Sequence, residues 1–128
     1  MRLTHSHYYL QIIQAKAFAI WKLGDYEQAL EVFTEMEEAL GNSPDRFKLF
    51  DNMALTYATI GEHEKAIEYY EKAREGIEQD NLGSNYLGVG FVQHAQKNYT
   101  ASIRSFSQAI FLFEKGTDGI KQFHFFFL

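Results

Sequence analysis

The chain has 128 residues, of which 46% are hydrophobic and 16% aromatic, and its formal net charge is −5 at pH 7. This composition supports one compact domain with a sizeable core and excludes a chain that is disordered throughout. The absence of cysteine excludes disulfides, thiolate zinc sites and cysteine nucleophiles. The acidic balance argues against nucleic acid as the primary ligand, because phosphate binding needs a basic surface.

The apolar runs are too short for a membrane span. They cover a few residues each, whereas a transmembrane helix needs about 20. The first residues also lack the apolar core of a signal peptide. We therefore expect a soluble, cytoplasmic protein with no membrane partner.

Amphipathic helices account for the hydrophobic pattern along the chain. Apolar side chains recur three and four residues apart, which is the spacing of one helix face. No alternating strand pattern is present, so the predicted fold class is all-α. In chain order the predicted helices cover residues 7–22, 26–40, 45–60, 63–77, 83–96, 99–114 and 118–127.

Glycines mark two of the expected turns within helix pairs. Gly24 and Gly61 stand where one helix stops and the chain reverses, and glycine adopts the left-handed conformation there at little cost. The third turn has Lys97 in this place. We therefore expect a positive φ at Lys97 or at Asn98, since asparagine tolerates that region better than most residues.

Short polar segments separate one helix pair from the next. They cover residues 42–45, 79–81 and 116–119. In the first of them Asn42 or Ser43 can cap the following helix, and Pro44 is expected in its first turn.

An internal repeat organises the helices in pairs. The segment 24–33 recurs as 61–70 and again as 97–106, so the period is 37 and then 36 residues. Each copy carries the second helix of a pair, and a second helical pattern precedes it. The repeats therefore cover about residues 8–43, 44–80 and 81–116, and with the terminal helix over 118–127 they form a single domain of residues 1–128.

The copies share small and aromatic residues at matching places. The matching residues are Leu23, Gly24, Tyr26, Ala29 and Phe33, then Gly61, Ala66, Tyr70 and Ala73, then Gly90, Tyr99, Phe106 and Ala109. This pattern resembles the tetratricopeptide repeat over about residues 8–115. The resemblance implies a right-handed superhelical array of three helix pairs plus a terminal helix. It also implies a non-catalytic module that binds a protein or peptide segment in its concave groove.

The first helix of each repeat should line that groove. Phe18, Leu55 and Phe91 are equivalent positions and form an apolar row bordered by amides and charges, which is the composition of a peptide groove. Alternatively, Phe18 and Phe91 are buried between neighbouring helices. The predicted peptide-binding residues are Gln14, Phe18, Trp21, Lys22, Lys48, Asn52, Leu55, Thr59, Leu87, Phe91 and His94.

One binding mode of the family does not match this chain. Chaperone adaptors of this type grip a C-terminal carboxylate with amide and basic side chains on three first helices. The corresponding residues here are Gln14, Phe18, Asn52, Ser84 and Gly88, of which only Asn52 fits. We therefore expect no carboxylate clamp.

Two fragments begin like catalytic or cofactor motifs and then fail. His63 and Glu64 open a helical zinc-protease pattern, but Ile67 stands where the second histidine is required. Gly88 and Gly90 open a dinucleotide loop, but Gln93 replaces the third glycine and no strand precedes it. We expect no enzyme activity, no cofactor and no metal.

Small residues are predicted to set the helix contacts. Ala29, Ala66 and Ser102 should lie where the two helices of a repeat touch. Gly90 should let paired helices approach, although a glycine inside a helix costs about 1 kcal/mol relative to alanine. Gly88 faces the groove, where it admits a ligand backbone, makes a soft joint or is simply tolerated.

The predicted terminal helix is apolar nearly all round. Phe123, Phe125, Phe126 and Leu128 cannot all face the preceding helix, and an end helix normally presents a polar outer face. We therefore expect a homodimer through residues 118–128, or else a chain that is part of a longer array. Two other functions stay open. One is the peptide-sensing portion of a bacterial regulator, whose repeats are similarly long; the other is a structural oligomerisation unit.

Overall fold

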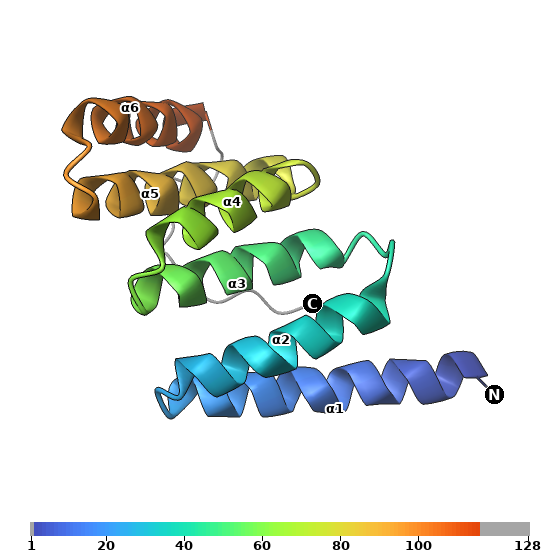
Figure 1. Cartoon of the computed structure of the whole chain (residues 1–128). Helices are drawn as coiled ribbons and strands as arrows, with labels where there is room; N and C mark the ends of the chain where they lie inside the picture. Colours follow the sequence, from blue (N-terminus) through green and yellow to red (C-terminus); the bar gives the residue numbers. More distant parts are fainter. Residues whose placement is uncertain (1, 116–128) are drawn as a thin grey trace.

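The computed structural model describes the backbone of residues 2–115 and the side chains of residues 8–115. This part of the chain contains α1 (Arg2–Lys22), α2 (Tyr26–Leu40), α3 (Arg46–Thr59), α4 (His63–Arg74), α5 (Gln79–Ala95) and α6 (Tyr99–Lys115). They form three antiparallel pairs stacked one after another (Figure 1). The predicted all-α array of helix pairs is confirmed. The predicted terminal helix over 118–127 lies outside the described residues.

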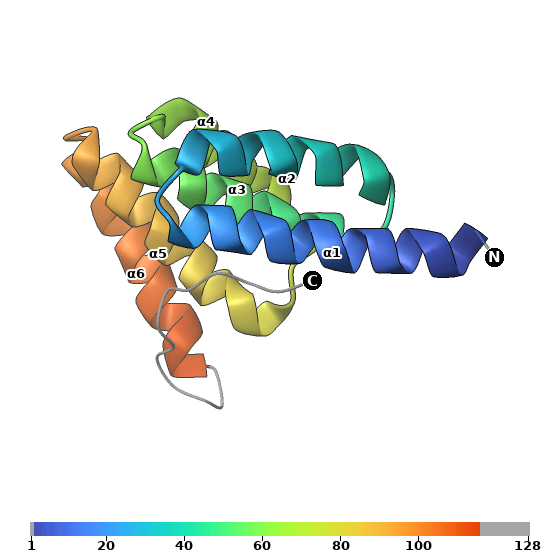
Figure 2. The same ribbon diagram turned by 90° about the horizontal axis from the view of Figure 1, so that it is seen from below.

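Successive pairs are rotated relative to one another along the array, and α3 and α5 lie on its inner side. Seen from below, α5 and α6 run at a clear angle to α1 and α2 (Figure 2). The backbones of α3 and α5 approach each other directly, whereas among the described residues no such approach joins α1 to α3, α2 to α4 or α4 to α6. This difference places α3 and α5 on the concave side.

The three turns within the pairs adopt the conformation that was expected. Gly24 and Gly61 have φ values of +87° and +83°, and Lys97 has a φ of +64°. Lys97 is the one residue other than glycine with a positive φ in the described part of the chain. The turn before α2 is also fixed by Asp25, whose Oδ1 accepts the backbone N–H of Gln28 at 3.3 Å.

Three helix boundaries differ from the predicted ones by three to five residues. The first helix begins at Arg2 rather than residue 7, and α4 ends at Arg74 rather than residue 77. Gly76 lies just beyond that end, and the ring of Phe47 occupies the place that a Cβ of residue 76 would take. Residues 79–81, predicted as a separating segment, instead form the first turn of α5.

Pro44 lies before α3 rather than in its first turn. The helix begins at Arg46, and residues 44–45 form the turn that precedes it. Ser43 still caps this turn, because its Oγ accepts the backbone N–H of Asp45 at 3.2 Å.

The core runs through all three pairs and has small residues where helices meet. Ala29, Ala66 and Ser102 are all buried, as predicted for the contact within each repeat. Gly90 also meets its expectation, since an added Cβ would lie 2.6 Å from the ring of Phe106. The large side chains with almost no exposure are Phe33, Met36, Leu49, Met53 and Tyr70.

The third turn offers a test of backbone strain. A non-glycine residue in the left-handed region destabilises the folded chain by about 1–2 kcal/mol. Glycine removes this strain, but it also loses more conformational entropy on folding, which offsets part of the gain. We therefore expect Lys97→Gly to raise the free energy of unfolding by about 0.5–1 kcal/mol, measured by urea denaturation. Gly61→Ala is the control and should lower it. A Lys97→Gly chain no more stable than the parent would contradict this account.

Candidate functional site

The apolar row on the first helices is open at one end and half-buried at the other. Phe91 on α5 is 58% exposed, with its ring edge-on to Phe106 at 5.3 Å between centroids. Phe18 on α1 and Leu55 on α3 are half-buried. Phe91 is therefore available to a ligand. Phe18 instead packs against the core, which is closer to the alternative prediction that this side chain is buried between helices.

At the α1 end, Phe18, Trp21 and Lys22 lie together. The rings of Phe18 and Trp21 stack at 6.4 Å with 14° between their planes, and the Lys22 Nζ lies 5.8 Å from the Phe18 ring. Trp21 also meets Tyr26 of α2 edge-on at 6.0 Å. The structure thus brings three of the predicted site residues into one cluster.

The polar residues predicted for the groove differ in accessibility. Asn52 is only 3% exposed, and its backbone carbonyl oxygen accepts a hydrogen bond from the Thr56 Oγ1 hydroxyl at 2.8 Å. Gln14 and Lys48 are half-buried. Thr59 is exposed, but its hydroxyl donates to the Leu55 carbonyl at 2.8 Å.

The remaining two predicted residues lie on α5. Leu87 is half-buried. His94 is exposed and packs edge-on against Tyr99 across the turn to α6, with ring centroids 5.3 Å apart. The imidazole thus sits at the turn and contacts a second helix.

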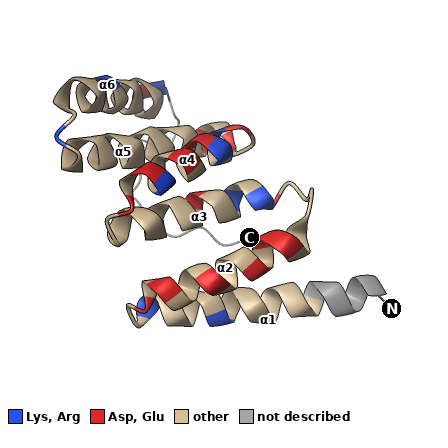
Figure 3. Cartoon of the chain, in the orientation of Figure 1, with Lys and Arg blue, Asp and Glu red and all other residues tan. Residues whose placement is uncertain are grey.

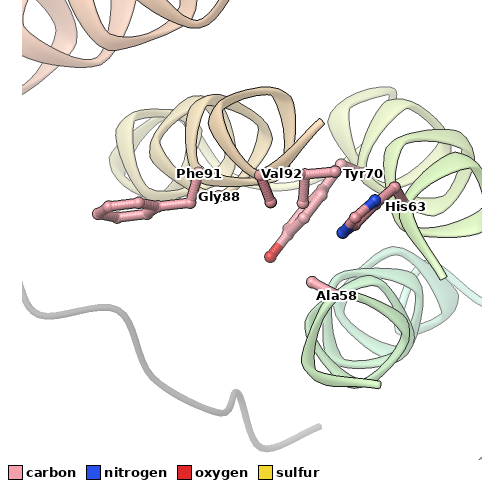
Figure 4. A pocket seen from close by; sticks show the side chains of 7 residues that line it. Ala58, His63, Tyr70, Gly88, Phe91 and Val92 are labelled. Atoms are coloured by element: carbon pink, nitrogen blue, oxygen red, sulfur yellow. The ribbon is translucent and has the colours of Figure 1, made fainter. Parts of the chain in front are cut away.

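A small pocket opens between the second and third pairs. It has a volume of about 120 Å³ and is lined by Ala58, His63, Tyr70, Gly88, Phe91, Val92 and Ala95 (Figure 4). Three helices contribute: α3, α4 and α5. The rings of Phe91, Tyr70 and His63 lie around it, and none of its lining residues is an aspartate, glutamate, lysine or arginine.

Gly88 has a packing role that the sequence analysis did not identify. A Cβ added there would lie 2.5 Å from the Cζ and Oη atoms of Tyr70. The glycine therefore lets the tyrosine of α4 lie against α5. The same missing side chain leaves room for the pocket.

A buried polar network joins α3, α4 and α5. The Asn85 Nδ2 donates to the Asp51 Oδ1 at 3.1 Å and to the Tyr70 carbonyl at 2.9 Å. The Arg74 Nε donates to the Asn85 Oδ1 at 3.0 Å, and the guanidinium lies 4.0 Å from the centre of the Tyr86 ring. Sequence reasoning missed this network. Its signal was an asparagine at the position where the second repeat has Leu49.

Two tyrosines of α4 have raised pKa values. Burial raises the pKa of Tyr70, and the nearby Asp51 carboxylate adds to the effect. Burial, with Glu37 of α2 close by, raises the pKa of Tyr69 to about 12. Both phenols are therefore neutral at physiological pH.

The two helices of the first pair, α1 and α2, differ in charge. Helix α2 carries five glutamates and no lysine or arginine, whereas the described side chains of α1 include Lys16 and Lys22 and no acid. Figure 3 shows this contrast, with further acids along α4. The row of Phe18, Leu55 and Phe91 thus lies on helices with few acids, away from the acidic outer side.

Neither a metal centre nor a membrane-spanning helix is found among the described residues. No three His, Asp or Glu side chains lie close enough there to hold a metal ion together. No described helix combines the length and the apolar character that crossing a bilayer requires.

The repeat pattern agrees with a known protein family. A family model described as "Tetratricopeptide repeat" matches residues 9–79. The chain belongs to the tetratricopeptide repeat family. Members of the family are helical repeat arrays, which is the architecture seen here.

Curated proteins similar to this chain include several named "Photosystem I assembly protein Ycf3". The protein from Synechococcus sp. (strain CC9605) is 42% identical over 69 residues, which cover 54% of this chain and 39% of the relative. The one from Prochlorococcus marinus (strain MIT 9215) is 30% identical over 95 residues, covering 74% and 54% respectively. This tetratricopeptide repeat chain therefore matches only about two fifths to one half of the length of these relatives.

The polar network leads to a stability prediction. Asn85→Ala removes two donors and one acceptor from a buried site, so we expect the free energy of unfolding to fall by about 2–3 kcal/mol. The exposed Asn42→Ala is the matched control, with an expected change within about 0.5 kcal/mol. Urea denaturation followed by circular dichroism measures both. Equal stability of the two variants would show that the network is energetically neutral.

Proposed function

We propose that this chain is a non-catalytic binding module that holds an extended protein or peptide segment along α1, α3 and α5. The observation that carries the proposal is the row of Phe18, Leu55 and Phe91 at equivalent places on three successive first helices. Its exposed member, Phe91, borders an apolar pocket. Apolar anchors with polar neighbours are how peptide grooves combine affinity with orientation.

The names of the relatives suggest what kind of partner to seek. Those proteins are named for the assembly of photosystem I, and an assembly factor acts by binding other proteins. We propose that this chain likewise holds a protein subunit that is to be joined to a larger complex. A cytoplasmic site of action stays a prediction. No specific observation favours a peptide-sensing regulator, so we do not propose that function.

Site-specific photocrosslinking in the native host tests the groove. A photoreactive phenylalanine analogue at Lys22 or Thr59, both exposed on first helices, should crosslink one and the same partner. The same analogue at Glu31 of α2 or Glu68 of α4, on the acidic outer side, should not. A partner captured from the outer positions but not from the groove would contradict the proposal.

Once a partner peptide is identified, the exposed anchor can be tested directly. Phe91→Ser should weaken binding about tenfold or more, because hot-spot aromatic residues carry much of the energy of an interface. Ile103→Ser is the matched control, since Ile103 on α6 is also an exposed apolar residue, at 64%. Isothermal titration calorimetry measures both affinities. Equal losses in the two variants would contradict a role for the groove.

We also propose self-association through the C-terminal end. Two positions of α6 support it: Ile110 and Phe111 stand where α2 has Glu37 and Glu38, and both side chains are more than half exposed. Such an apolar surface, followed in sequence by Phe123, Phe125, Phe126 and Leu128, fits a symmetric contact with a second copy.

Sedimentation equilibrium tests this contact. The intact chain should be a dimer, and a chain ending at Lys115 should be a monomer. A monomeric intact chain at micromolar concentration would refute self-association. A truncated chain that still dimerises would place the contact elsewhere.

A further inference from the structure

Two residues that line the pocket between the second and third pairs have larger counterparts one repeat earlier. Because the repeats are 37 and 36 residues apart, each lining residue has an equivalent in the preceding repeat. Ala58 corresponds to Trp21, and Gly88 corresponds to Asn52. At these two positions the pocket therefore has smaller side chains than the preceding repeat, and the larger difference is that between alanine and tryptophan.

Trp21 shows what kind of group occupies that place in the first repeat. It is half-buried, packs against the hydrophobic core, and meets Tyr26 edge-on at 6.0 Å. Tyr26 is the equivalent of His63, whose imidazole lines the pocket. An aromatic ring beside the first residue of the second helix is therefore an arrangement this chain already uses once.

The size and lining of the pocket also suit one aromatic ring. An enclosed apolar cavity of about 150 Å³ holds benzene. This pocket has a volume of about 120 Å³ and is open to solvent, so an inserted ring would be partly enclosed and would keep one edge outside the pocket. Phe91, Tyr70 and His63 supply three rings, and aromatic pairs gain energy beyond that of burial alone. A charged side chain would lose hydration there, since no described lining residue carries a compensating carboxylate, ammonium or guanidinium group.

We propose that the pocket receives an aromatic side chain of the segment bound in the groove. The inserted ring takes the position that the Trp21 indole holds in the first repeat. This inference rests on the proposed function, which supplies the bound segment. It also specifies the partner: the bound segment carries a phenylalanine, tyrosine or tryptophan at the position that contacts α5.

The pocket can be tested without knowing the partner. The probes are the single-residue amides N-acetyl-L-tryptophanamide and N-acetyl-L-phenylalaninamide, with N-acetyl-L-leucinamide as the aliphatic comparison. Methyl NMR of Ala58, Val92 and Ala95 reports occupancy. We expect saturable shifts with millimolar dissociation constants for the aromatic probes and about fivefold weaker binding of the leucine probe. Equal affinities, or no saturable shift, would overturn the proposal.

Filling the pocket provides the matched variant. Ala58→Trp restores the residue of the first repeat and should abolish binding of the aromatic probes while keeping the helical circular dichroism spectrum. Ala39→Trp, at an exposed site on α2, is the control and should bind them unchanged. If Ala58→Trp does not fold, Ala95→Met on the exposed rim replaces it. Normal binding by a folded, filled variant would overturn the assignment.

The result separates this inference from the proposed function. If the groove positions crosslink a partner and no aromatic probe binds, the pocket assignment fails while the groove stands. If the probes bind but the crosslinks come only from the outer side, the groove fails instead. Loss of both probe and partner binding in Ala58→Trp, with neither lost in Ala39→Trp, supports the aromatic anchor.

Discussion

Contact between a ring on one helix and a small residue on its neighbour determines how this array packs. Tyr70 of α4 lies against Gly88, and Phe106 of α6 lies against Gly90, at distances that leave no space for a Cβ atom. Phe47 of α3 lies equally close to Gly76, in the turn that follows α4. Such pairs fix the spacing of adjacent helices, because a close-packed interior cannot absorb an extra carbon without a shift. The groove and its pocket keep their shape because of these contacts.

The helix pairs could be predicted from sequence because three copies repeat the same physical solution. Gly24 and Gly61 indicate two of the turns, and the repeat pattern places the third at Lys97. A lysine is unfavourable at a positive φ, yet the backbone turns there as well. Boundaries were harder to predict. Residues 79–81 are polar and look like a loop, yet they make the first turn of α5 because α4 has already ended before Gly76.

The interior of the site was less predictable than the fold. The role of Gly88 depends on where Tyr70 of another helix lies, and a single helical pattern does not contain that information. The same is true of Asn85, whose partners are 34 and 15 residues away in the chain. Asn52 looked like a ligand-binding amide because it falls on the inner face, but it is almost fully buried. The spacing of apolar residues in the sequence indicates on which face of a helix a residue lies. How deeply that residue is buried depends on the neighbouring repeats that pack against this face.

The network of Asp51, Asn85 and Arg74 also bears on how the array unfolds. It ties together helices of the second and third pairs, while the packing of α2 on α3 is sparser. In a repeat protein, stability is roughly a sum of units and of the interfaces between neighbours. We therefore expect the second and third pairs to unfold as one cooperative block, with the first pair joined to it by a weaker interface. Amide hydrogens of α1 and α2 should accordingly exchange with solvent through partial opening, before the rest of the array unfolds.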